Sequence, residues 1–130
     1  HGIEPVRVRT LNGKPSEGRI RLNVSRVENK LRILIEDDGR GIDWNAVRAK
    51  AVQMQIAPLE EVTNWPESKL YGLLFRLGFS TLPESNQDAG RGIGMDIVRT
   101  RIQTLHGRIS ITTETGKFSC FVITFPIPTK

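Results

Sequence analysis

The sequence predicts a two-layer α/β domain, in which a mixed or antiparallel sheet is covered by helices on one face. Apolar residues alternate in two stretches near each end of the 130-residue chain, which indicates a pair of strands at each end. In the middle of the chain, apolar residues recur at helical spacing instead. A doubly wound parallel sheet would require strict alternation of strands and helices, so the order of elements favours hairpins.

The first predicted hairpin lies in the N-terminal third of the chain. Residues 1–18 are predicted to be irregular because prolines and glycines interrupt them. Alternating apolar residues then predict strands at 19–25 and 31–37, joined by a turn near Glu28. Asp37 ends the second strand on the same face as its apolar residues. An unpaired carboxylate in that position is costly, so we expect Asp37 to have a hydrogen-bond donor.

The central part of the chain is predicted to be helical. Asp43 can cap a helix at 44–55, and shorter helices are expected at 59–63 and 67–76. An aperiodic polar stretch follows at residues 79–90. It is long for an idle connection. We predict that residues 81–89 within it form a lid, which is mobile without ligand and orders partly when a triphosphate binds.

The second predicted hairpin follows one more helix. Apolar residues at helical spacing predict this helix at 94–106, and Gly107 is well placed to end it. His106 would then interact favourably with the helix dipole. Alternating residues predict strands at 108–114 and 118–127.

Composition narrows the class of protein. The net charge of +5 invites a nucleic-acid partner, but no aromatic residues interleave with the basic residues of the first quarter to stack on bases. No apolar run approaches the roughly 18–20 residues of a membrane span, and no signal peptide opens the chain. The single Cys120 excludes an internal disulfide and fits the reducing cytosol, which predicts a cytoplasmic protein. Because the chain starts at His1 without Met, we expect it to be a piece of a larger protein.

Two glycine-rich turns carry the functional signal. The first is Asp37-Asp38-Gly39-Arg40-Gly41, where glycines let the backbone bend and let a flat group approach closely. The second, Gly90-Arg91-Gly92-Ile93-Gly94, opens a helix, and a glycine-rich helix start suits phosphate. Each turn alone could be an ordinary tight turn, but a carboxylate for a base and a nest for phosphates together suggest a nucleotide. The spacing differs from the Gly-x-Gly-x-x-Gly of dinucleotide-binding and kinase loops, and no Walker A sequence occurs.

Four short motifs resemble one family of ATP-binding domains. Residues 36–43 resemble the G1 box of the histidine-kinase, gyrase and Hsp90 (GHKL) type. Residues 90–98 resemble the G2 box of its chemotaxis-kinase (CheA-like) branch, and residues 75–81 resemble the F box of that branch. Residues 1–4, His-Gly-Ile-Glu, resemble the tail of its N box. The motifs stand in the family's order and span nearly the whole chain.

The resemblance implies a catalytic domain of a two-component sensor histidine kinase. ATP and Mg²⁺ would be its cofactors, and the γ-phosphoryl group would pass to a histidine on another domain. Asp37 would accept a hydrogen bond from the adenine amino group, Gly41 would face the adenine, and Ser119 would help to anchor the base. His1 would lie near the phosphates as a catalytic candidate. The residues implied to bind the nucleotide are Asp37, Gly39, Gly41, Gly90, Gly92, Gly94 and Ser119.

The sequence departs from the family pattern at two places. Phe118 stands where the family often has glycine, which weakens the role of Ser119. The asparagine of the N box, which ligates Mg²⁺ in relatives, would lie upstream of His1, so no metal ligand is assigned in this chain. We therefore expect an N-terminally truncated domain that folds, exposes apolar sheet surface, binds ATP poorly and phosphorylates nothing by itself.

The implied partners are the phosphoacceptor histidine domain of the same kinase, a response regulator, a chemoreceptor and a coupling protein. Neither nucleic acid nor direct membrane insertion is expected. The alternative reading is a regulatory or scaffolding module whose nucleotide site has degenerated. A gyrase- or Hsp90-like ATPase is a further alternative, which residues 75–81 and the Met95-Asp96 continuation disfavour.

Overall fold

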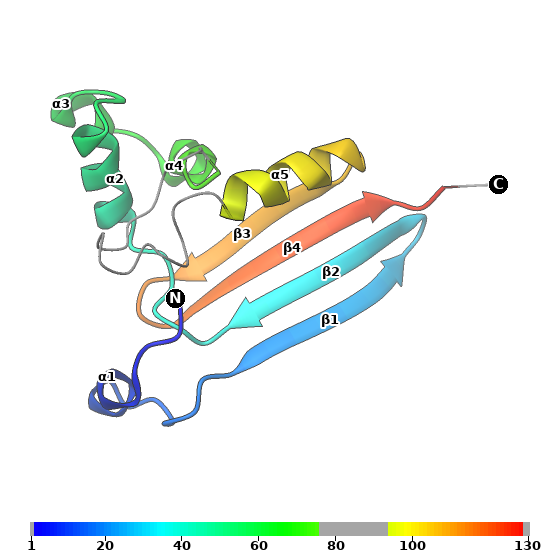
Figure 1. Ribbon diagram of the computed structural model, residues 1–130, viewed down its shortest axis with the longest axis horizontal. Helices are drawn as coiled ribbons and strands as arrows, with labels where there is room; N and C mark the ends of the chain where they lie inside the picture. The colour runs from blue at the N-terminus through cyan, green and yellow to red at the C-terminus, as the bar shows by residue number, and fades with distance from the viewer. Residues whose placement is uncertain (1, 76–93, 129–130) are drawn as a thin grey trace. The chain divides into compact units, whose positions relative to one another are not determined.

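A computed structural model describes residues 2–75 and 94–128 of the chain (Figure 1). The chain forms two compact units, His1–Ile42 with Ile102–Lys130, and Asp43–Arg101. Each unit is described separately. The predicted lid at 81–89, most of the second glycine motif and His1 lie outside the described residues.

A four-stranded antiparallel sheet forms most of the first unit. Its strands are β1 (Ile20–Val27), β2 (Lys30–Asp37), β3 (Arg108–Glu114) and β4 (Phe118–Pro126), in the spatial order β1-β2-β4-β3. Both predicted hairpins are confirmed, as β1–β2 and β3–β4. The sequence left open whether the sheet is mixed or antiparallel, and every neighbouring pair is antiparallel. The pairing of β2 with β4 joins the two hairpins, which are about seventy residues apart in the sequence.

One face of this sheet carries its apolar residues. The strand register places side chains of β1, β2, β4 and β3 in rows across that face, because alternate residues of a strand point the same way. The face comprises Ile20, Leu22, Val24, Leu31, Ile33, Ile35, Phe121, Ile123, Phe125, Ile109 and Ile111. On the edge strand β1 the side chains of Ile20, Leu22 and Val24 are 70%, 65% and 55% exposed. The apolar face is therefore open to solvent along β1 in the described structure.

The opposite face of the sheet is more polar and includes the single thiol. Cys120 pairs with Glu36 in the β2–β4 register and is buried. Burial, and then the charge of Glu36, raises the pKa of the Cys120 thiol above its ordinary value. These surroundings fit an inert structural cysteine.

The helix α1 (Val6–Leu11) contradicts the prediction that residues 1–18 are irregular. It follows Pro5, whose φ of −58° suits a helix start. The helix has no apolar stripe to signal it, since Val6 and Leu11 are 60% and 76% exposed. Its buried residue is instead Arg9, which is 0% exposed. Periodicity could not reveal a helix that is anchored by an arginine.

The second unit contains three of the predicted helices: α2 (Trp44–Gln53), α3 (Leu59–Val62) and α4 (Glu67–Leu73). Asp43 caps α2 as predicted, because its Oδ1 accepts hydrogen bonds from the backbone amides of Asn45 and Ala46 at 3.0 and 3.2 Å. The rings of Trp44 and Tyr71 pack with centroids 5.0 Å apart, which links α2 to α4. The buried apolar residues of this unit are Trp44, Val47, Ala51, Val62 and Leu70.

The four helices predicted from the sequence all end earlier than expected, and two of these endings use a left-handed residue. α2 ends at Gln53 because Gln55 has φ +57° and the next amide bonds back to Ala51 at 3.0 Å. α5 (Gly94–Thr104) ends before His106, which also has φ +57°. Gly107 was expected to take this conformation, but it serves close packing instead: a Cβ on Gly107 would lie 2.5 Å from Phe125 Cδ1.

Candidate functional site

The turn that follows β2 brings several distant backbone segments together. The Gly39 Cβ position would lie 2.2 Å from the Gly2 carbonyl oxygen, and the Arg40 amide donates to that same oxygen at 2.8 Å. Gly41 has φ +67°, and a Cβ there would lie 2.3 Å from the Glu114 carbonyl oxygen. Glycine is thus required at both positions because the chain's own backbone makes the close approach.

The two neighbouring aspartates of the turn have different surroundings. Asp38 accepts a hydrogen bond from the Arg19 amide at 2.8 Å and another from Arg9 Nη2 at 2.9 Å. The Arg19 bond, more than the Arg9 bond and charge, holds the pKa of Asp38 below its ordinary value of 3.8. Asp37 Oδ1 accepts from the Gly39 amide at 2.9 Å, so the predicted donor is confirmed. No hydrogen bond from the described residues reaches Asp37 Oδ2.

Hydroxyl side chains continue the row that Asp37 begins. The register places Asp37 opposite Ser119 on β4, and Ser119 opposite Thr113 on β3, all on one face at the same end of the sheet. Ser119 is 7% exposed, and its Oγ lies 3.5 Å from Thr113 Oγ1. Thr113 also accepts from the Ile42 amide and donates to the Phe118 carbonyl oxygen, each at 2.9 Å. Thr113 therefore ties the glycine turn to the β3–β4 hairpin.

Phe118, which departs from the family pattern, points away from this row. Its position precedes Ser119 in β4, and consecutive side chains of a strand leave on opposite faces. The ring therefore lies on the face opposite Asp37. The backbone carbonyl oxygen of Phe118 accepts a hydrogen bond from Thr113.

Buried charges hold the turn on its N-terminal side. Arg9 Nη1 donates to Glu4 Oε1 at 3.1 Å and to the Asp38 carbonyl oxygen at 3.2 Å. Lys14 Nζ donates to Glu4 Oε2 at 2.7 Å. It also donates to the carbonyl oxygens of Asp38 and Gly39, at 2.9 and 2.8 Å. Burial alone raises the pKa of Glu4, but the Lys14 hydrogen bond and the Lys14 and Arg9 charges outweigh it and lower the pKa. Each buried charge is thus paired.

Comparison with known proteins identifies the family. Residues 8–129 match the model of the family described as histidine kinase-, DNA gyrase B-, and HSP90-like ATPase. The chain belongs to this ATPase family. The family resemblance predicted from the short motifs is confirmed.

Among the relatives of this ATPase domain, two carry the name chemotaxis protein CheA. That of Halobacterium salinarum is 39% identical over 98% of this chain and 19% of the relative, and that of Treponema pallidum is 41% identical over 98% and 15%. A gliding motility regulatory protein of Myxococcus xanthus is 36% identical over 97% of this chain and 16% of the relative. The chain therefore spans less than a fifth of the length of these relatives. The CheA-like branch that the motifs predict is confirmed.

The ATPase fold is also found among solved structures. The mycobacterial sensor histidine kinase MprB is similar to this chain with a TM-score of 0.53, covering 86% of this chain and 59% of that one at 18% sequence identity. This likeness concerns the fold alone, and it agrees with the predicted α/β architecture. In the described parts of the chain, none of the helices has the length and apolar character needed to cross a membrane.

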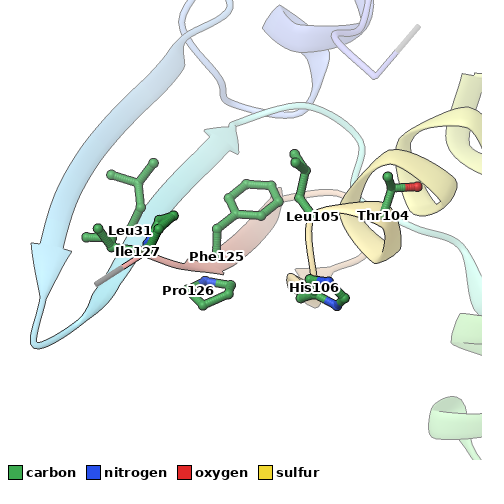
Figure 2. Close-up of a pocket in the computed structure, with 8 residues that line it drawn as sticks. Leu31, Thr104, Leu105, His106, Phe125, Pro126 and Ile127 are labelled. Atoms are coloured by element: carbon green, nitrogen blue, oxygen red, sulfur yellow. The ribbon is translucent and has the colours of Figure 1, made fainter. Parts of the chain in front are cut away.

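An apolar pocket lies at the other end of the ATPase sheet (Figure 2). It has a volume of about 790 Å³ and is lined by Leu31, Thr104, Leu105, His106, Phe125, Pro126, Ile127 and Pro128. No carboxylate lines it, whereas adenine recognition requires an acceptor for an amino group. The polar row at Asp37 therefore remains the candidate site.

The first unit brings together four of the residues predicted to bind the nucleotide: Asp37, Gly39, Gly41 and Ser119. Gly94 begins α5, while Gly90, Gly92 and His1 lie outside the described residues. Sequence reasoning missed Thr113, Arg9 and Lys14. Thr113 could have been found only from the register of β3 against β4.

Proposed function

We propose that this ATPase domain binds ATP and serves as the catalytic domain of a chemotaxis-type histidine kinase. Its reaction would transfer the γ-phosphoryl group of ATP to a histidine on another domain. The observation that carries the proposal is Asp37 Oδ2, which accepts no hydrogen bond from the described residues. Asp37 directly precedes the glycine turn and pairs with the buried Ser119 in the strand register, and the chain belongs to this ATPase family.

The chemistry of the row suits the edge of an adenine. Asp37 would accept a hydrogen bond from the adenine amino group, and a charge-assisted bond of this kind contributes about 1.5–3 kcal/mol. Ser119 can donate or accept, so it would anchor a ring nitrogen directly or through a water molecule. Asp37 keeps its orientation because the Gly39 amide occupies Oδ1.

Phosphate and metal contacts would come from other residues. We propose that Gly90, Gly92 and Gly94 surround the phosphates through backbone amides at a helix start. The described residues contain no group of three or more histidine, cysteine or acidic side chains that could hold a metal ion. At nucleotide sites Mg²⁺ is usually held by one or two protein ligands together with the phosphates, so we propose that it binds with ATP, and we assign no ligand to it among the described residues. His1 remains a proposed neighbour of the phosphates.

The proposed partners belong to the longer protein. They are the phosphoacceptor histidine domain of the same kinase, a response regulator, a chemoreceptor and a coupling protein, in the cytoplasm. Because the relatives are more than five times longer than this chain, we propose that the chain alone phosphorylates nothing. The alternative of a degenerate regulatory or scaffolding module draws on Phe118 alone, and the ring of that residue points away from Asp37.

Calorimetric titration with ADP tests the proposal. Asp37→Asn should weaken binding about tenfold, since a neutral amide replaces the charged acceptor. Glu36→Gln is the matched control, because it makes the same charge change on the opposite face of β2 and should leave the affinity unchanged. An unmodified chain that binds no ADP at millimolar concentration would refute the proposed function. Equal affinities of the chain and of Asp37→Asn would remove Asp37 from the site.

A further inference from the structure

We infer that Arg9 and Lys14 are positioning residues, which orient the peptide planes of the turn that carries Asp37. Together with Glu4, which binds both cations, they form what we call the carbonyl clamp. The inference rests on the proposed function for its effect on nucleotide affinity. Its structural part concerns only the described hydrogen bonds of the turn.

The first peptide plane joins Asp38 to Gly39. Arg9 and Lys14 donate to its carbonyl oxygen at 3.2 and 2.9 Å. In a planar trans peptide the N–H points opposite to the C=O, so holding the oxygen fixes the direction of the amide. That amide, of Gly39, donates to Asp37 Oδ1 at 2.9 Å. The two cations therefore aim the donor that orients the Asp37 carboxylate.

The second peptide plane, from Gly39 to Arg40, is held in the same manner. Lys14 donates to its carbonyl oxygen at 2.8 Å, and its amide donates to the Gly2 carbonyl oxygen at 2.8 Å. Two successive planes are thus fixed at both ends. A cation on a carbonyl also polarises the peptide and strengthens its N–H as a donor. Gly39 adds little rigidity of its own, because glycine is conformationally permissive.

The two cations have different tasks within the clamp. Arg9 spreads five hydrogen bonds over carboxylates and carbonyls, including those of Pro15 and Glu17 at 2.8 and 3.1 Å, and it is fully buried. Its removal would break the ion pairs with the buried Glu4 and with Asp38 and leave carbonyl oxygens without their donor, which would endanger folding. Among the described residues, the side chain of Lys14 donates only to Glu4 and to the two turn carbonyls. Lys14 is consequently the position at which the clamp can be tested without dismantling the N-terminal segment.

The test combines NMR of the Gly39 amide with ADP titration, both well below the unfolding temperature. Lys14→Met keeps an unbranched side chain but has no donor, so the Gly39 amide should change its chemical shift and exchange faster with solvent. ADP affinity should fall about 2- to 10-fold, the equivalent of one lost hydrogen bond. Lys14→Arg should restore both properties, because arginine again supplies donors to the carbonyls.

Lys117→Met is the matched control. Lys117 pairs with Glu114 at 3.0 Å in the neighbouring hairpin turn, is exposed, and should change neither readout. An unchanged Gly39 amide and unchanged affinity in folded Lys14→Met would overturn the clamp, as would an affinity loss without an amide change. If the original chain binds no ADP, the proposed function fails, yet an altered Gly39 amide in Lys14→Met still supports the clamp. If Lys14→Met does not fold, Glu4→Gln provides the test, because it weakens the interaction of Glu4 with both cations. The chemical shift of the Gly39 amide should then change in Glu4→Gln, and an unchanged chemical shift would overturn the clamp.

Discussion

Gly41 offers the sharpest test of how the turn is built. Gly41 and Gly116 both have positive φ, +67° and +83°, and both lie in turns of the same unit. They differ in the space around a Cβ. At Gly116 nothing lies within 4 Å, whereas at Gly41 the Glu114 carbonyl oxygen lies at 2.3 Å and the Phe118 carbonyl oxygen at 3.0 Å. Comparing alanine at the two positions therefore separates the cost of the backbone conformation from the cost of close approach.

The magnitudes follow from these distances. A left-handed alanine costs about 1–2 kcal/mol, offset by about 0.4–1 kcal/mol because the unfolded chain loses freedom. Gly116→Ala should thus destabilise by roughly 1 kcal/mol or less. At Gly41 backbone atoms must also move, which strains the Arg40–Gly116 bond of 2.6 Å and the Ile42–Thr113 bond of 2.9 Å. Adding about 0.5–1.5 kcal/mol for each of these two bonds gives a total of about 1–4 kcal/mol for Gly41→Ala.

Urea unfolding followed by circular dichroism measures both costs. The free energy of unfolding should fall more for Gly41→Ala than for Gly116→Ala, at a similar dependence on urea. ADP affinity should fall only for Gly41→Ala, since its turn carries Asp37. Equal destabilisation by the two alanines would show that the backbone approach at Gly41 is not a constraint, and the account of this turn would be wrong.

Three further outcomes are expected. Thr113→Val should lower the free energy of unfolding by about 1–3 kcal/mol, because the Ile42 backbone amide loses its acceptor. As a control, substitution of the exposed Thr112 on the other face, Thr112→Val, should change the free energy of unfolding by less than about 0.5 kcal/mol. Similar losses for the two variants in urea unfolding would contradict the role of the Thr113 hydroxyl. Cys120 should react with a thiol reagent at pH 8 far more slowly in the native chain than in urea, because burial raises its pKa, and equal labelling rates would refute this. The lowered pKa values of Glu4 and Asp38 contribute stability that is complete above their ordinary values of 4.5 and 3.8 and is lost as the pH falls through the lower folded values. The urea concentration at the unfolding midpoint should therefore decrease as the pH is lowered below about 4.5, and it should decrease less in Glu4→Gln. A midpoint that stays constant from pH 6 to pH 3 would contradict the pairing.

Alternation along the strands made the sheet and Asp37 predictable. Asp37 falls on the face of the apolar residues of β2 by counting alone, and its need for a donor follows from the cost of an unpaired charge. Counting singles out Asp37 but does not show how Asp38 is bound, because the partners of Asp38, Arg9 and the Arg19 amide, approach from the N-terminal segment. The fold, not the local sequence, therefore decides that both oxygens of Asp38 are hydrogen-bonded.

Long-range pairing explains the other omissions. Thr113 acquires its role by accepting from the amide of Ile42, 71 residues earlier, which only the sheet register brings near. Arg9 stands in a helix whose apolar side chains are exposed, so the hydrophobic pattern carried no signal there. The left-handed residue at the end of α5 is His106 and not the predicted Gly107, because Gly107 packs closely against Phe125.

The apolar pocket and the proposed nucleotide end share one strand, and this has a pharmacological consequence. Leu31 in the pocket and Asp37 at the turn are six residues apart on β2, which is about 20 Å at the rise of an antiparallel strand. A compound seated against Leu31, Leu105 and Phe125 would not occupy the space of a nucleotide bound at Asp37. High cellular ATP would therefore not displace it by competition, in contrast to any inhibitor built on the adenine ring.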